Sequence, residues 1–437
     1  MKFTIFQSDK GDCLLLESSG GTRILADGGM LRAYGVHVAP HLGRMRKSKK
    51  ELDLVYVSHI DEDHIAGILQ MMDDEAAWRV FDFQSEQGNT HFPKPKNPRP
   101  AKAKAIWHNA FHEQTGENAG PIEDLLAASA SVLSAAVDPD HLSTAQELGE
   151  LALSQKQAIL LSRRIGGNQL NIPLNEPAEG KLMYVRENLS PFALGDLNIY
   201  VIGPFEEDLD VLRKEWDKWL KDNKEVVRKI QERAAEDEAN IGNDIQRLTD
   251  MLAAKAAELG NREKVTPPNL ASLMFLIEEP SDTDTPKRYL MTGDGSWQDI
   301  LKGLRHHEFI TDASPGLHVD VLKAQHHGSE NNFSEEFCKA ITADHYVFCG
   351  NGEHENPDLR VIDLVVNSRI GTAAQRSSNP QTGKTFKMWF NSSSTSSIKP
   401  AAQSHMKKVE KKIQDAAATS NKVKFRFLDA PNFQFTV

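Results

Sequence analysis

The stretch LDLVYVSHIDEDHIAG, residues 52–67, joins a short apolar run to a dense group of metal-binding side chains. The apolar run predicts a buried β-strand, and the residues after the group predict a helix. The group offers two imidazoles and two carboxylates, a mixture that zinc and manganese accept as ligands: His59, Asp61, Asp63 and His64. Because side chains alternate in direction along a strand and its turn, His59 and Asp61 are expected to face one ion. Asp63 and His64 would then face a second ion, and two metals in one pocket suggest hydrolysis.

Further candidate ligands recur later in the chain, each after an apolar segment that predicts a strand. They lie in the motifs WHN at 107–109, TGD at 292–294 and HHGS at 326–329. A plainer interpretation of the first motif is that Asp63 or His64 only caps the helix. The ordered series of motifs favours a metal site instead.

The composition is that of a globular protein with a large core. The chain has 437 residues, of which 39% are hydrophobic, enough for one large domain with an elaborate insertion. Its first segment has only a short apolar run and no small-residue cleavage site, so we expect a cytoplasmic protein without a membrane segment. The three cysteines are too few and too scattered for a disulfide framework or a thiolate zinc site.

The formal net charge of −11 argues against nonspecific binding of polyanions by the chain as a whole. Two basic stretches could still bind phosphate locally, RMRKSKK at 44–50 and a Lys-rich segment at 399–424. For both, a solvated surface is the simpler interpretation.

Two helical segments interrupt the strand-like parts of the chain. After the ligand motif we expect a helix over 65–74 and then a strand over 78–84. Segment 121–169 is rich in Ala, Leu and Ser and predicts an inserted helical layer. From Leu212 to Leu259, apolar residues recur three or four positions apart, which is the spacing of a coiled-coil seam. Such an arm would form a homodimer, dock a protein partner or gate the pocket, or else only stabilise its own domain.

Several motifs, in this order, resemble the metallo-β-lactamase fold family, and within it the hydrolase domain of ComEC-type DNA uptake proteins. They are GDCLLLE, LADGG, SHIDEDHIAG, NLASLMFLIEE, YLMTGD, VLKAQHHGSENN and HENP, and they cover residues 1–110 and 190–395 in pieces. The resemblance implies an α/β fold, a four-layer αββα sandwich with two sheets face to face, helices outside and the metals at one edge.

The expected parts follow the motifs. The two halves of the fold would be residues 1–110 and 266–395, with a further sheet strand at 191–205. A mainly helical insertion is expected at 111–190 and a coiled-coil-like insertion at 206–265. Residues 396–437 would be a Lys-rich helix with closing strands, which form either an edge of the main domain or a small appendage.

The resemblance also implies how the metals are held. The first metal would be bound by His59 and Asp61. The second would be bound by Asp63 and His64, with Asp294 bridging the two ions. A bridging carboxylate makes physical sense because it neutralises the pair of ions and fixes their separation. Asp63 is in addition the candidate catalytic carboxylate.

Other residues take roles in the same comparison. His326 would complete the second metal site, and His327 would lie behind it or face the substrate. For the ligand of the WHN motif, His108 is the best candidate, with Asn109 or no residue at all as alternatives. Asp27, in LADGG, is expected to brace the ligand loop from behind rather than to bind metal.

The sequence departs from the commonest family pattern at Asp61, where many members have His. A carboxylate hardens the site, so manganese becomes an alternative to zinc for the two divalent ions. Ser329, with the backbone around Gly328, could hold a substrate oxyanion, and His354 in EHENP could protonate a leaving group. A loop serine and a surface histidine are the simpler interpretations of these two residues.

The function expected from these features is that of a two-metal hydrolase, a phosphodiesterase or nuclease that acts on nucleic acid or a nucleotide-derived substrate through metal-bound hydroxide. One alternative keeps the site but changes the substrate to a thioester, lactone or β-lactam. Another is of a different class, a metal-domain scaffold or sensor that recruits partners through the helical arm.

Overall fold

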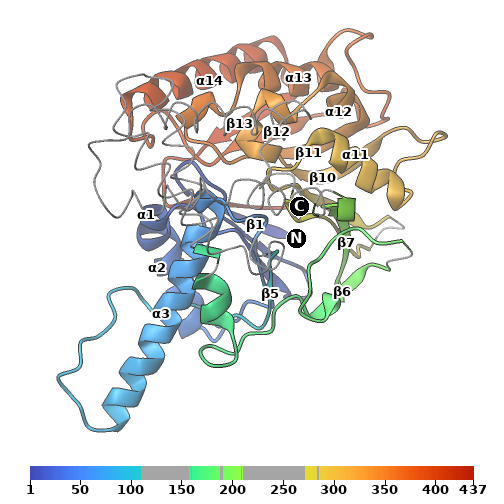
Figure 1. Cartoon of the computed structure of the whole chain (residues 1–437). Helices are drawn as coiled ribbons and strands as arrows, with labels where there is room; N and C mark the ends of the chain where they lie inside the picture. Colours follow the sequence, from blue (N-terminus) through green and yellow to red (C-terminus); the bar gives the residue numbers. More distant parts are fainter. Residues whose placement is uncertain (110–156, 159, 188–189, 208, 210–270, 283–284) are drawn as a thin grey trace, which may run out of the picture.

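The computed structural model describes residues 1–109, 157–158, 160–187, 190–207, 209, 271–282 and 285–437 (Figure 1). The coiled-coil seam predicted from Leu212 to Leu259 lies outside these residues, and so does most of the helical layer predicted at 121–169. Within the described part of the chain, no helix has the length and apolar character needed to cross a bilayer.

A mixed six-stranded sheet is built from the first strands of the chain and its last one. Its order is β14-β1-β2-β3-β4-β5. Strands β14 to β3 are antiparallel, whereas β3, β4 and β5 run parallel. The strands are β1 (Lys2–Phe6), β2 (Leu14–Glu17), β3 (Arg23–Ala26), β4 (Leu54–Tyr56), β5 (Ile106–Trp107) and β14 (Asn432–Thr436).

The second sheet is also mixed and has eight strands in the order β13-β12-β11-β10-β9-β8-β7-β6. Strands β6 to β9 pair antiparallel, and β9 to β13 pair parallel. The strands are β6 (Phe192–Leu194), β7 (Leu197–Gly203), β8 (Met274–Glu279), β9 (Lys287–Met291), β10 (Leu317–Lys323), β11 (Ile341–Phe348), β12 (Phe386–Phe390) and β13 (Val423–Phe427).

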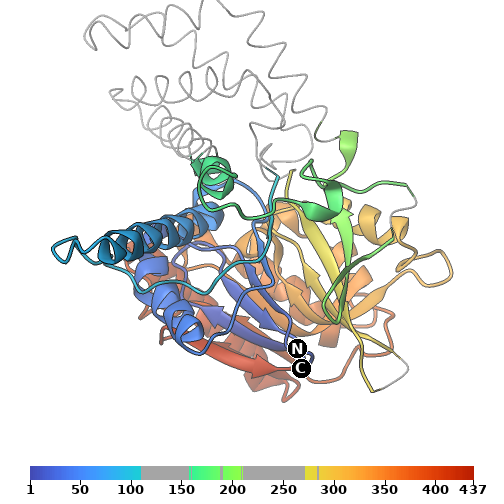
Figure 2. The same cartoon turned by 90° about the horizontal axis from the view of Figure 1, so that it is seen from below.

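Each sheet has its own set of helices. Beside the first sheet lie α1 (Leu31–Ala33), α2 (Ala39–Lys47) and α3 (Glu62–Glu86), with the π-helical turn η1 (Tyr34–Val38) between α1 and α2. Beside the second lie α11 (Trp297–His306), α12 (Glu335–Ala340), α13 (Leu359–Ile370) and α14 (Pro400–Thr419). The whole is a mixed α/β fold, in which the two ends of the chain lie side by side (Figure 2).

Three hydrophobic clusters hold these elements together. One cluster joins the first sheet to α2 and α3, through residues such as Leu25, Leu42 and Ile68. A second joins the two sheets, and in it Tyr56 of β4 packs on Phe275 of β8 with ring centroids 4.7 Å apart. The third joins the second sheet to α11, α12, α13 and α14. Each sheet therefore buries both of its faces.

The closing segment belongs to the main domain. Strands β12 and β13 extend the second sheet, and β14 pairs with β1 in the first. Between them, α14 packs on the second sheet through Met406, Val409 and Ile413. Of the two alternatives for residues 396–437, an edge of the main domain is the one observed.

The strand predicted at 78–84 is wrong, because α3 continues through this segment to Glu86. Its aromatic and β-branched residues favoured a strand, but neither Gly nor Pro occurs between Gly67 and Gly88 to end the helix. Val80 and Phe83 do not enter the core and are 48% and 57% exposed. The spacing of apolar residues in this segment therefore does not report which side chains are buried, and it could not distinguish a strand from a helix.

Candidate metal centre

The ligand motif forms the loop between β4 and α3. Asp61 is the residue before the first turn of α3. The start of the helix packs closely against the turn after β3. The amide of Gly28 donates to the carbonyl of His64 at 2.8 Å, and a Cβ on Gly67 would lie only 2.0 Å from the carbonyl oxygen of Gly28. Glycine at these positions lets the helix start, and with it the ligand loop, lie against the sheet.

Asp27 lies behind this loop, as expected. Its carboxylate accepts hydrogen bonds from the backbone amide of Ser58 at 2.7 Å and from the Ser58 hydroxyl at 2.8 Å. The second oxygen also lies 3.0 Å from Nδ1 of His64. Asp27 itself has φ 56°, the left-handed conformation that turns the chain at the end of β3.

The turn after β9 brings Asp294 to the same place. Gly293 has φ 50°, and a Cβ there would lie 2.9 Å from Cβ of Ser58, so glycine permits the close approach of the second sheet to the ligand loop. The amide of Leu273, just before β8, donates to the carbonyl of Ser58 at 2.7 Å. Residues far apart in the sequence therefore meet at one edge of the two sheets.

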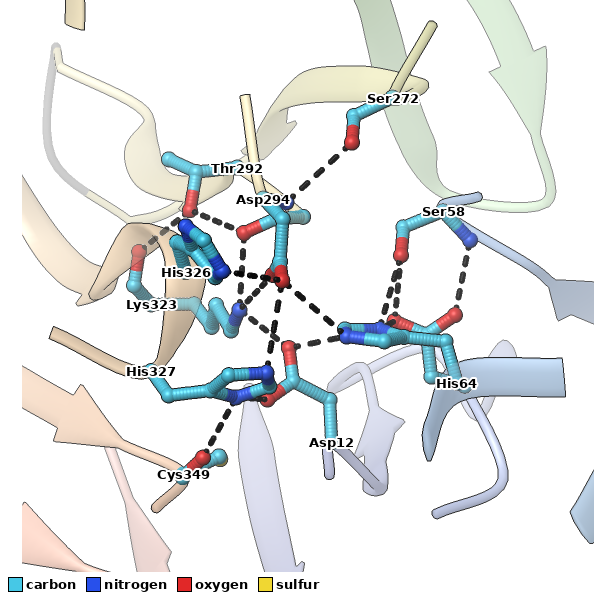
Figure 3. A network of polar contacts seen from close by, with 12 residues as sticks. Asp12, Ser58, His64, Ser272, Thr292, Asp294, Lys323, His326, His327 and Cys349 are labelled. Carbon is cyan, nitrogen blue, oxygen red and sulfur yellow. Dashed lines mark hydrogen bonds and ion pairs between the residues drawn. The ribbon is translucent and has the colours of Figure 1, made fainter. Parts of the chain in front are cut away.

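One oxygen of Asp294 is the centre of the cluster (Figure 3). Its Oδ2 lies 3.4 Å from Nε2 of His327 and 3.5 Å from Nε2 of His64. The Nε2 atoms of His59 and His326 lie 3.8 Å from the same oxygen. Asp294 is 2% exposed, so this convergence takes place in a buried setting.

The other nitrogen of each imidazole is held by a fixed protein group, which orients the ring. The Nδ1 atom of His327 donates to the carbonyl of Cys349 at 2.7 Å. The Ser58 hydroxyl lies 3.1 Å from Nδ1 of both His59 and His64, and Asp27 lies 3.0 Å from Nδ1 of His64. Nδ1 of His326 contacts the Asn332 side-chain oxygen at 2.7 Å. All four rings thus direct Nε2 toward Asp294.

The donor set fits a divalent cation. The Nε2 atoms of His59 and His64 are buried and have no hydrogen-bond partner among the residues that the structure describes. Buried polar nitrogens without a partner are costly in a folded protein, and a coordinated ion would satisfy them. Ligand atoms of four buried residues lie within 4.8 Å of one another, a group that could hold a metal ion: Asp12, His64, Asp294 and His327.

The two aspartates of the loop lie on different sides of this centre. Asp61 has an oxygen 3.4 Å from Nε2 of His59. Asp63 has one 3.1 Å from Nε2 of His327 and another 4.0 Å from Nε2 of His64. His327 therefore lies against Asp63, the position expected for His326 from the motif.

Asp12 and Lys323 are the residues that the sequence did not single out. Asp12 lies between β1 and β2, and its Oδ1 is 3.1 Å from Nδ1 of His327. Lys323 ends β10 and contacts both Asp12 and Asp294. Both lie in quoted motifs, GDCLLLE and VLKAQHHGS, and a charged residue flanked by buried apolar ones was the available signal.

The charges of the cluster shift the pKa values of its members. Burial opposes the ionised form of Asp294, but His327 and the other neighbouring cations hold the pKa of this carboxyl well below its usual range. Burial opposes the charge of His327 as well, yet the surrounding carboxylates, first that of Asp294, raise its pKa to about 10. For His326 burial prevails and lowers the pKa. The adjacent histidines thus differ in charge at neutral pH.

His108 and Asn109 of the WHN motif directly follow β5 and are buried. His108 is fully buried, and Asn175 binds its backbone through both the amide at 2.8 Å and the carbonyl at 2.9 Å. The side chain of Asn109 is likewise committed to the backbone of Met183. His108 is not among the four residues that could hold an ion, so its role as a ligand stays a prediction.

Ser329 and His354 lie on neighbouring loops. The hydroxyl of Ser329 accepts from the amide of Asn331 at 3.4 Å, as a loop serine does. His354 is exposed, on the short 3-10 helix Glu353–Glu355. This loop packs on the HHGS loop, because the amide of Asp358 donates to the carbonyl of Gly328 at 3.0 Å. Their catalytic roles also stay predictions.

No protein-family model matches this chain, and no curated protein matches it. The site is therefore interpreted from its own geometry.

Proposed function

We propose that this protein is a metal-dependent hydrolase with two divalent ions that cleaves phosphodiesters in nucleic acid or in a nucleotide-derived substrate. One observation carries the proposal: four imidazole Nε2 atoms converge on Oδ2 of Asp294, while each Nδ1 contacts a protein group. The proposal includes the metallo-β-lactamase fold, a four-layer αββα sandwich. The three hydrophobic clusters, one between the sheets and one outside each sheet, support it.

The contacts divide the ligands into two sets. His59 and Asp61 would hold one ion, and Asp63, His64 and His327 the other. Asp294 would bridge the ions, because its Oδ2 faces imidazoles of both sets. His326, whose Nε2 faces the same oxygen, remains available to the first set.

The donor chemistry favours manganese or zinc. Three carboxylates among the donors make the centre harder than an all-imidazole one, which suits manganese, whereas the imidazoles suit both metals. Divalent ions at such a centre supply a nucleophilic water near neutral pH and neutralise charge on a phosphate.

Residues of this chain would orient the substrate and take a proton from the attacking water. Asp63 lies at the border of the second set, 3.1 Å from His327, and is the carboxylate that would take the proton of the attacking water. Ser329 with the Gly328 backbone would hold a substrate oxygen, and His354 would protonate the leaving group. The last two roles rest on their place in the loops around HHGS.

The direct test is a substrate panel with the purified protein loaded with either zinc or manganese. We expect cleavage of single-stranded DNA, RNA or a generic phosphodiester that chelation abolishes and metal restores. Double-stranded DNA, a thioester, a lactone and a β-lactam complete the panel and identify the alternative hydrolases. Inertness toward every phosphodiester with both metals bound would overturn the proposal.

A further inference from the structure

Lys323 is a buried cation at the end of β10, with a side chain that is 2% exposed. Its ammonium donates to the carbonyl of Gly293 at 2.9 Å. It also lies 3.5 Å from Oδ1 of Asp294 and forms an ion pair with Oδ2 of Asp12. One ammonium therefore connects carboxylates that come from the two sheets (Figure 3).

The ammonium contacts one oxygen of each carboxylate, so the two oxygens of each acid have different surroundings. On Asp294 it takes Oδ1, which leaves Oδ2 for the four imidazoles. On Asp12 it takes Oδ2, which leaves Oδ1 only 3.1 Å from Nδ1 of His327. A buried lysine is stable only when it is paired, and the pairing here fixes which oxygen of each acid faces the centre.

Asp12 also approaches the histidines from a different side than Asp294. It lies near the Nδ1 atoms of His327 and His64, at 3.1 and 3.8 Å, whereas Asp294 lies near their Nε2 atoms. An acceptor at Nδ1 orients an imidazole whose Nε2 binds a metal. Asp12 is positioned as such an acceptor for His327, beside the Cys349 carbonyl that lies 2.7 Å from the same nitrogen.

We propose that Lys323 is a positioning residue of the metal centre, which orients Asp294 directly and His327 through Asp12. The inference rests on the proposed function and extends it. In this proposal Asp12 acts on His327 at Nδ1, although it also belongs to the group of four residues that could hold an ion.

Binding of Co²⁺, followed by its visible spectrum, tests the proposal without any substrate. The variants are Lys323→Met, Asp12→Asn and the double variant, compared with the wild type. Lys339→Met is the matched control, since this lysine pairs with Glu335 on the surface of α12. Folding is checked by circular dichroism and thermal unfolding.

We expect Lys323→Met to bind Co²⁺ about 10- to 100-fold more weakly than the wild type, with a changed spectrum, as for other residues that orient ligands. Asp12→Asn should show a smaller loss of the same kind. The double variant should lose less than the product of the two single losses, because the two residues act as a unit. Lys339→Met should match the wild type.

Where Lys323→Met fails to fold, the double variant carries the test, because it removes both charges of the pair. A folded variant without the Lys323 ammonium that keeps the wild-type Co²⁺ affinity and spectrum overturns this inference alone. A wild-type protein that binds no Co²⁺ overturns the proposed function together with it.

Discussion

The two ligand-bearing regions are built in different ways. In the loop 58–64, the ligands lie within a few residues, and the groups behind them, Asp27 and Ser58, belong to the same sheet. In the second region, Asp294 and the histidine pair come from separate turns, and His327 contacts Asp12, which lies between β1 and β2 of the first sheet. The first region is organised by local sequence, and the second by contacts across the domain.

The histidine pair shows what this difference means. His326 and His327 have φ values of 45° and 56°, so two successive residues adopt the left-handed conformation. The regular alternation of a strand does not extend through such a turn. His327, rather than His326, consequently lies against Asp63.

The largest effect is expected where both regions meet. Asp294→Asn removes the charge that faces all four imidazoles, and we expect it to lower phosphodiester hydrolysis by about 1000-fold, equivalent to about 4 kcal/mol. Asp363→Asn on α13, which pairs with Lys412 at the surface, is the control. Steady-state kinetics with parallel metal analysis is the measurement. A rate for Asp294→Asn near that of the control would contradict a bridging role.

The second prediction separates the two histidines. His327→Ala should reduce metal content and hydrolysis about 10-fold more than His326→Ala, because His327 contacts both Asp63 and Asp294. Inductively coupled plasma mass spectrometry of the purified variants gives the number of metal ions bound per chain. Equal losses, or a larger loss in His326→Ala, would restore the order expected from the motif.

The third prediction concerns support within the first region. Asp27→Asn keeps the shape of the side chain but removes its charge and so weakens its contacts with Ser58 and His64. We expect a loss of about 10-fold in metal affinity with little change in fold. Competition with a chromophoric chelator measures it. An unchanged affinity would show that the Ser58 hydroxyl alone orients both histidines.

The smallest expected effect is on the number of protons that the protein releases when it binds a metal ion. Since its pKa is raised to about 10, His327 is protonated at pH 7.5 in the metal-free protein and must release that proton to bind an ion. Its contribution to the stability of the metal-free protein is fully present below its unfolded pKa of about 6.5 and is lost as pH rises through 10. Metal affinity should therefore increase with pH.

Calorimetric titration of Mn²⁺ in buffers of different ionisation enthalpy measures the protons released. His327→Ala should release about one proton fewer than the wild type. His326→Ala should release the same number as the wild type, because burial lowers the pKa of His326. The same count in both variants would remove the contrast between the neighbours.

Much of the fold follows from local sequence. The strand before the ligand loop, the strands that carry Asp294 and the HHGS loop, and the helix 400–419 lie close to where the patterns predict them. Period and turn residues determine such elements over short distances. The strand at 78–84 failed because its apolar residues belong to the exposed part of a long helix.

The amino-acid sequence alone was enough to single out four candidate ligands, His59, Asp61, Asp63 and His64, because they lie within six positions of one loop. The packing of the domain was needed to show that Asp12 and Lys323 lie beside these residues and that His327 lies against Asp63. Those contacts link residues hundreds of positions apart and depend on the packing of two sheets. No local pattern records which oxygen of a buried carboxylate an ammonium will occupy.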